Sequence, residues 1–258
     1  MKIQIFQDTL DLFRKKISLK QYIRCISRFF FGKKLDYYGC KYDEIISLGY
    51  NCEISQRFSD VFCNSKFEHY LYTWSYEYDR EGFLSSLKNL DNFVETTYSV
   101  LPNGMIKHEK YNIAFHAKYP KEELISEYNL TTKIIPEAIE ELKDRLNYLS
   151  KKTERIFHSD RKCLFVLKLK RTQVEQDINF VTELNNILKN KFDNPKAEYT
   201  LLVVIEKADY SKDELRYIYN QSNLNVKYSA INCFANDADT GTDGDILGWN
   251  RILKEFLI

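Results

Sequence analysis

The sequence predicts an α/β fold, a three-layer sandwich with a mostly parallel sheet, and three observations lead to this prediction. The C-terminal half alternates short apolar runs with amphipathic segments. The apolar runs are nearly continuous, as in KCLFVLKL and YTLLVVI, which is typical of strands that are buried on both faces. The composition is that of a compact chain, because only eight Gly and four Pro occur in 258 residues, with no low-complexity tract.

Strands and helices are expected in turn along residues 41–258, which form the predicted catalytic-like domain. The expected strands are 44–48, 162–169, 199–205 and 225–231. The expected helices are one that starts at or just after Cys52, a long one after Pro136, and those at 80–90, 175–190, 212–219 and 245–257. Residues 93–119 are expected to be extended, with a tight turn at Asn103–Gly104.

Residues 1–40 differ from the rest and form the second predicted unit, a basic amphipathic helical arm. They carry nine Lys and Arg against three Asp, and apolar side chains interleave with these charges at roughly helical spacing. The favoured interpretation is that the apolar face of the arm packs on the main domain. The alternative is that the arm lies on the inner face of a membrane or docks on a protein partner, for which the cluster RFFFGKK is suited.

Charge and cysteine usage limit the partners and the compartment. The chain has 38 Lys and Arg and 37 Asp and Glu, so no nucleic-acid partner is expected. Its six cysteines include no CxxC pair, and its start lacks a signal-peptide pattern, which together predict free thiols in the cytoplasm. No metal is expected either, because the acidic run DADTGTDGD lacks the spacing and closing Glu of a calcium loop.

The run YDEIISLGYNCEISQRF (residues 42–58) is the strongest functional signal. It predicts a buried strand, a tight turn and a helix that begins at Cys52. Such a turn exposes a nucleophile at the edge of a sheet, and the helix N-terminus favours a thiolate. Backbone amides near Asn51 and Cys52 are expected to bind an oxyanion. The alternative is that Cys52 is a small buried core residue.

A nucleophilic thiol needs a base and a group that orients the base. Of the four histidines, His116 ranks first because it ends an apolar strand-like run, and His69 ranks second. His108 and His158 are expected to be exposed. The orienting acid is sought in the loop at 236–245, with Asp245 chosen, although Asp243 or Asp245 could equally cap the last helix.

The run ISLGYNCEISQRF resembles the opening motif of a bacterial family of papain-like cysteine peptidases, in which a strand leads to S-L-G-x-x-C and a helix. The family continues with P-F-D-W. Here Trp74 matches, but Thr73 stands where the family has Asp. Phe115–His116 resembles the family's histidine at a strand end, and Leu164–Val166 resembles its L-F-V strand. The resemblance covers roughly residues 42–255 and implies thiol-dependent hydrolysis by Cys52 and His116.

The same stretch is similar to a second family, the capsule polysaccharide enzymes that open with strand-G-N-C-helix and are thought to be coenzyme A-linked acyltransferases. Gly49-Tyr50-Asn51-Cys52 is one residue longer than that motif. An acyltransferase needs basic residues for a nucleotide phosphate, and Lys168, Lys170 and Arg171 follow a predicted strand. Coenzyme A is the cofactor expected in that case, and no cofactor otherwise.

Three functions therefore remain open on sequence grounds. The first is a Cys52–His116 hydrolase or acyltransferase acting on a small molecule, a glycan or a peptide, with His69 and Trp74 contacting the substrate. The second is the coenzyme A-linked acyltransferase of surface polysaccharide biosynthesis. The third is a non-enzymatic partner subunit of a glycan-assembly complex, docked through residues 1–40.

Overall fold

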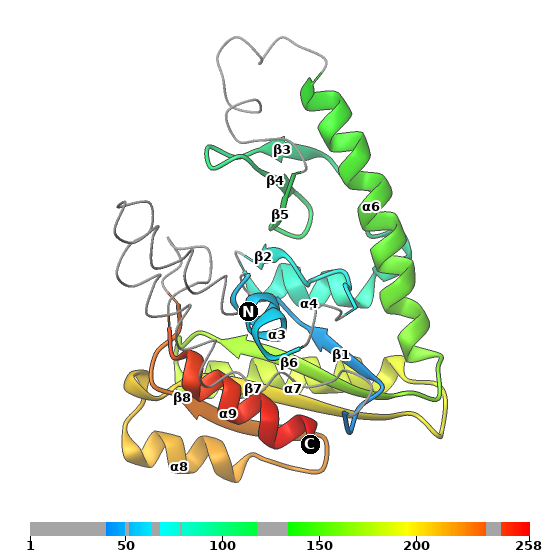
Figure 1. The fold of residues 1–258 in the computed structure, drawn as a ribbon. Helices are drawn as coiled ribbons and strands as arrows, with labels where there is room; N and C mark the ends of the chain where they lie inside the picture. Colours follow the sequence, from blue (N-terminus) through cyan, green and yellow to red (C-terminus); the bar gives the residue numbers. More distant parts are fainter. Residues whose placement is uncertain (1–39, 50–51, 63–67, 78, 118–133, 236–243) are drawn as a thin grey trace, which may run out of the picture.

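The computed structural model describes residues 40–49, 52–62, 68–77, 79–117, 134–235 and 244–258 (Figure 1). The arm expected at residues 1–40 therefore lies outside the described residues, except for Cys40 at its end.

A four-stranded parallel sheet forms the lower half of the molecule in Figure 1 and confirms the α/β class. Its strands are β1 (Glu44–Ser47), β6 (Lys162–Leu169), β7 (Glu198–Glu206) and β8 (Val226–Ile231), in the order β1-β6-β7-β8. All three neighbouring pairs are parallel, and the β6–β7 register extends from Lys162↔Glu198 to Leu169↔Ile205. The near-continuous apolar runs are thus strands buried on both faces, as the sequence predicts.

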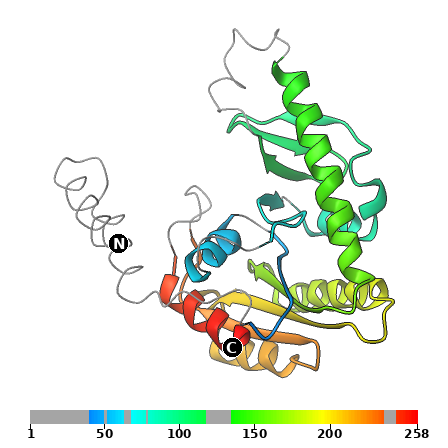
Figure 2. The same cartoon turned by 45° about the vertical axis from the view of Figure 1, so that its right-hand side comes forward.

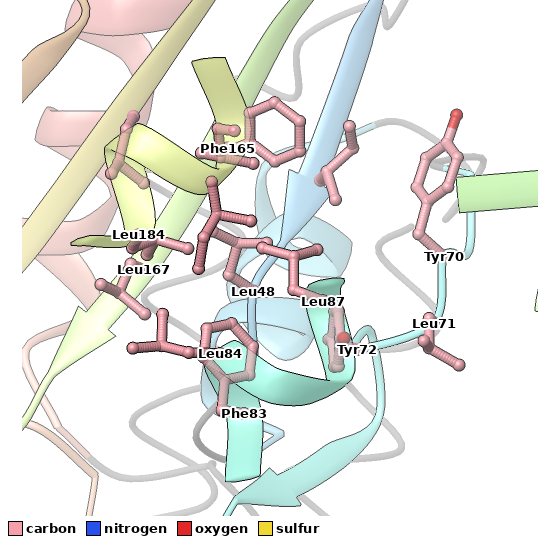
Figure 3. Close-up of a cluster of buried hydrophobic side chains, with 14 of the residues drawn as sticks. Leu48, Tyr70, Leu71, Tyr72, Phe83, Leu84, Leu87, Phe165, Leu167 and Leu184 are labelled. Atoms are coloured by element: carbon pink, nitrogen blue, oxygen red, sulfur yellow. The ribbon is translucent and has the colours of Figure 1, made fainter. Parts of the chain in front are cut away.

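Helices cover both faces of this sheet, because alternate strand residues point to opposite sides. On one face, Leu164 and Val166 join a core with α3 (Glu53–Val61) and α9 (Ile246–Leu257). On the other face, Phe165 and Leu167 pack with α4 (Arg80–Lys88) and α7 (Val174–Lys191) (Figure 3). A further helix, α8 (Lys212–Asn220), lies against β8 and α7.

A second sheet, antiparallel and also four-stranded, stands above the first in Figure 1. Three of its strands lie in the stretch 93–119 that was expected to be extended, but a separate sheet was not predicted. Its order is β2-β5-β4-β3, with strands β2 (Ser75–Glu77), β3 (Tyr98–Val100), β4 (Met105–His108) and β5 (Ile113–His116). The turn predicted at Asn103–Gly104 does connect β3 to β4, with Gly104 at a positive φ of 79°. The prediction failed at β2, which is only three residues long and lies in an aromatic stretch without alternation.

The long helix α6 (Ile134–Phe157) runs beside both sheets (Figures 1 and 2). Its buried side chains share one core cluster with residues of the antiparallel sheet, such as Phe115, and of the parallel sheet, such as Phe165. Two short 3₁₀ turns, η3 (Leu90–Asn92) and η4 (Lys207–Asp209), complete the described elements. The continuous core places the turn after β1 next to the end of β5.

Candidate active site

Cys52 sits at the junction between β1 and α3, as the sequence predicts. Strand β1 ends at Ser47, and Gly49 turns the chain with φ 81°, a conformation that glycine adopts without strain. The Gly49 amide donates to Ser47 Oγ at 3.2 Å. The first hydrogen bond of α3 runs from the Gln56 amide to the Cys52 carbonyl at 3.0 Å. The Cys52 thiol is therefore at the positive end of the helix dipole.

His116 lies at the last position of β5, and its Nε2 is 3.1 Å from Cys52 Sγ. The three residues before it in β5 are buried, whereas the His116 side chain is exposed. Arg145 of α6 donates a hydrogen bond to the His116 carbonyl. The structure thus brings together the two residues that rank first in the sequence, although 64 positions separate them and they come from different sheets.

A cavity of about 720 Å³ opens beside this pair. Apolar side chains make up most of its wall. They are Tyr70, Leu71, Trp74, Phe115, Leu146, Tyr148 and Leu149. Its volume is within the range of small-molecule sites. The reactive atoms Cys52 Sγ and His116 Nε2 therefore face a mainly apolar space.

The position of Cys52 at a helix N-terminus favours a thiolate, but the surroundings of the Cys52–His116 pair favour the opposite protonation state. Burial and the nearby Glu77 carboxyl raise the pKa of Cys52 to about 11. Desolvation and the Arg145 charge lower the pKa of His116. Both shifts favour the neutral forms, so at neutral pH the pair is an uncharged thiol and an uncharged imidazole within hydrogen-bond reach. The prediction of a stabilised thiolate is corrected on this point.

Glu77 is a site residue that the sequence does not single out. Its carboxyl group is buried against the turn before Cys52, so closely that a Cβ atom on Gly49 would collide with it. Ser75 donates a hydrogen bond to Glu77 Oε1. Burial, the main cause, raises the pKa of Glu77 to about 8. A lone acidic residue within the aromatic run TWSYEY is a weak signal, because only the fold shows that it is buried.

His69 and Trp74 both line the cavity, on the segment opposite α6. The indole N–H of Trp74 donates to His69 Nδ1 at 3.2 Å. This bond occupies one ring nitrogen of His69 as an acceptor, and burial lowers the pKa of His69, so its ring is neutral. The expected contact of these two residues with a substrate stays a prediction. Asn51 lies outside the described residues.

Lys168 and Arg171 do not line the Cys52 cavity but a second cavity, of about 690 Å³, at the end of β6. Lys168 is buried, and its Nζ is 2.9 Å from Glu53 Oε2. Arg171 donates to Glu214 at 2.8 Å and to the Asp209 carbonyl. Both cations already have protein partners, and neither is a solvated cation beside the thiol. The expectation that they bind the phosphate of a nucleotide substrate stays a prediction.

Asp245, the predicted orienting acid, is the N-cap of α9 instead. Its carboxylate accepts hydrogen bonds from the Gly248 amide at 2.7 Å and from the Asn232 backbone and side chain. The capping alternative therefore describes this residue. In the described part of the chain, no carboxylate forms an ion pair with His116 that would replace Asp245 as orienting acid.

Glu53, directly after the candidate nucleophile, is a second residue that sequence reasoning missed. Its Oε1 accepts from the Trp249 indole and from the Ala235 amide, both at 3.0 Å. Together with the Lys168 ion pair, these bonds tie the start of α3 to β6 and to α9. A Glu at the first position of a helix reads as a dipole-favouring surface residue, and only the fold shows it to be fully buried.

The other two histidines are separate from the site. His108 was expected to be exposed, but it is buried: its Nε2 lies 2.6 Å from the Phe93 carbonyl, and its ring stacks on Tyr111. His158 is exposed, as expected, and its Nδ1 is 2.7 Å from Asp193. Over the residues that the structure describes, no cluster of three His, Cys, Asp or Glu could hold a metal ion.

Comparison of the chain with protein-family models, with curated proteins and with solved structures finds no match. Within the described ranges, no helix combines the length and the apolar character needed to cross a membrane.

Proposed function

We propose that the protein is a thiol-dependent acyl hydrolase or acyltransferase in which Cys52 is the nucleophile and His116 is the base. The observation that carries the proposal is the 3.1 Å separation of Sγ and Nε2 at an open cavity. A nucleophile and its base must come within hydrogen-bond reach, and a strand–turn–helix junction is where α/β enzymes present a nucleophile.

The neutral thiol–imidazole pair defines the chemistry of attack. As Sγ bonds to a carbonyl carbon, His116 Nε2 takes the thiol proton, and the former carbonyl oxygen becomes an oxyanion. Collapse of this tetrahedral intermediate expels the leaving group, which receives the proton from His116, and leaves an acyl-Cys52. Water or an acceptor hydroxyl then attacks the acyl group while His116 takes its proton, and the thioester C–S bond breaks. The Cys52 sulfur leaves and regains the proton from His116, which restores the thiol. We expect amides at the start of α3 to stabilise the oxyanion.

The volume of the cavity suits a small acyl group. The described residues beside Cys52 line a cavity of about 720 Å³, which is within the range of small-molecule sites. The basic residues expected for a coenzyme A phosphate lie in the other cavity and have protein partners. We therefore place a small acyl ester or thioester ahead of a coenzyme A-linked donor.

A second function has one observation in its favour. The raised pKa of Cys52 is also what an unreactive, structural thiol shows. A non-enzymatic subunit of a glycan-assembly complex, docked through residues 1–40, would need no reactive thiol.

Acylation of Cys52 by p-nitrophenyl acetate separates these functions. We expect a burst of p-nitrophenol and an acetyl group on the Cys52 peptide, detected by mass spectrometry. The exposed Cys233 is the internal control for unspecific acylation. The burst should disappear in Cys52→Ser and should slow at least a hundredfold in His116→Ala. Equal labelling of Cys52 and Cys233, or an unchanged rate in His116→Ala, would support the structural role instead.

A further inference from the structure

The cavity beside Cys52 has apolar walls but one charged lining residue among those that the structure describes. Its other polar lining groups are the neutral residues Gln56 and Thr73, the Cys52 thiol, the hydroxyls of two tyrosines, the Trp74 indole N–H, and two histidines with lowered pKa values. Arg145 keeps its positive charge at neutral pH, because a guanidinium does not lose its proton in proteins. The described lining residues therefore form an apolar space that carries one positive charge.

Arg145 stands next to the reacting atoms. One of its Nη atoms donates to the carbonyl of His116, the residue whose ring contacts Cys52 Sγ. The charge of Glu141, four residues earlier on α6, also acts on Arg145. The planar fork of a guanidinium is the geometry that pairs with carboxylates and phosphates. Its α6 neighbours Leu146, Tyr148 and Leu149 line the same cavity. One turn of α6 thus presents the cation and an apolar wall together.

We propose that this cavity binds an apolar acyl chain whose head is an anion, with the chain between α6 and residues 70–74 and the anionic head at Arg145. An acid of this kind is the form in which a hydrolysed acyl group leaves Cys52, so the ligand class deepens the function proposed above and rests on it. Binding itself needs no thiol, and this permits a separate test.

The test uses three probes with the same chain and different heads: octanoate, octanol and octylamine. They are titrated into the full-length Cys52→Ser protein by isothermal calorimetry at pH 7, so that no chemistry occurs. We expect octanoate to bind at least tenfold more tightly than octanol, and octylamine to bind most weakly, because Arg145 repels its ammonium group. Octyl phosphate, as a fourth probe, distinguishes a carboxylate site from a phosphate site.

Two variants locate the two parts of the ligand. Arg145→Gln should reduce octanoate affinity about tenfold and leave octanol affinity unchanged. The octanoate affinity of Arg145→Lys should lie between those of Arg145→Gln and the protein that keeps Arg145. Leu149→Ala should weaken the binding of octanoate and octanol equally, since it removes an apolar contact with the chain and leaves the charge of Arg145 in place. Butanoate should bind more weakly than octanoate, by up to about fourfold for each missing methylene group that is buried. Octanoate should also protect Cys52 of the wild-type protein from iodoacetamide.

Several results would overturn the proposal. They are equal binding of octanoate and octanol, tighter binding of octylamine, no binding of octanoate at all, or no effect of Arg145→Gln. The failure of the proposed chemistry is a different result: octanoate binds the Cys52→Ser protein, but no acyl-Cys52 forms from the nitrophenyl ester. If acyl-Cys52 forms while octanoate does not bind, the chemistry stands and the ligand class is wrong.

Discussion

The two sheets each bring one member of the Cys52–His116 pair to the site, and they hold it by different means. On the side of the parallel sheet, Cys52 begins a helix whose first residue, Glu53, is locked in a buried ion pair with Lys168. On the side of the antiparallel sheet, His116 ends a strand near the surface. It is held by backbone pairing with Met105 and by the Arg145 hydrogen bond to its carbonyl.

This difference separates stability from activity. The groups behind Cys52 are buried charges, and loss of one partner leaves the other uncompensated. His116 is exposed, and its loss leaves no buried polar group without a partner. Changes on the parallel side should therefore act mainly on the free energy of unfolding, and changes on the antiparallel side mainly on the rate of acyl transfer.

The largest effect is expected for His116→Ala. Removal of the base should lower kcat/KM for ester hydrolysis about 10²- to 10⁴-fold, with little change in the unfolding midpoint. His158→Ala is the matched control, since His158 is exposed and pairs with Asp193 away from the site. Because the pKa of His116 is lowered, the wild-type rate should fall only as the pH drops below 6.5. A similar loss in both variants would contradict the assignment of His116 as base.

The second effect is a loss of stability in Lys168→Met, which removes the nearer of two cations from the buried Glu53 carboxylate and leaves the Arg57 pair at 3.8 Å. Loss of one partner of a buried pair typically costs about 3–5 kcal/mol in the free energy of unfolding. The matched control is Lys162→Met on the same strand, because the Lys162–Glu198 pair is partly exposed and should contribute less than about 1 kcal/mol. Urea denaturation measures both values. Equal values for the two variants would mean that the Lys168–Glu53 pair does not hold α3 in place.

The sequence predicts the parallel sheet better than the antiparallel sheet, because the strands and helices of the parallel sheet have a clear hydrophobic periodicity. Continuous apolar strands between amphipathic helices are unmistakable, so β6, β7 and β8 appear within a residue or two of their predicted bounds. The junction at Cys52 is also local: a strand, a glycine at positive φ and a helix follow each other directly. Local patterns of this kind are visible in one sequence.

The antiparallel sheet depends on contacts that no local pattern shows. Strand β2 is three residues long, and it exists because Ser75 and Glu77 pair with Phe115 and Ile113 far along the chain. Burial of charge is equally nonlocal. In the sequence, Lys168 resembles a phosphate ligand, but in the structure its Nζ is 2.9 Å from Glu53. Asp245 resembles a catalytic acid, but its carboxylate accepts hydrogen bonds from Gly248 and Asn232. The pairing of Cys52 with His116 was predicted from residue chemistry and context, not from distance.

The smallest expected effect concerns Glu77, which connects the two sides because it belongs to β2 and contacts the turn after β1. Its pKa in the folded protein is about 8, against an ordinary value near 4.5. The contribution of Glu77 to the free energy of unfolding is therefore fully present below pH 4.5 and is lost as the pH rises to about 8. A shift of this size lowers the free energy of unfolding by about 2 kcal/mol between pH 6 and pH 8.

Glu77→Gln keeps the shape and the hydrogen bonding of the protonated acid but cannot ionise, so this decline with pH should disappear. Urea denaturation at pH 6 and pH 8 measures it, with Glu198→Gln, on the exposed start of β7, as the control that should leave the decline intact. The same variant removes one cause of the high pKa of Cys52, so its alkylation by iodoacetamide at pH 9 should be faster than in the wild-type protein. An unchanged decline and an unchanged alkylation rate would mean that Glu77 is not coupled to the thiol, and the two sheets would then meet at the site without an electrostatic link.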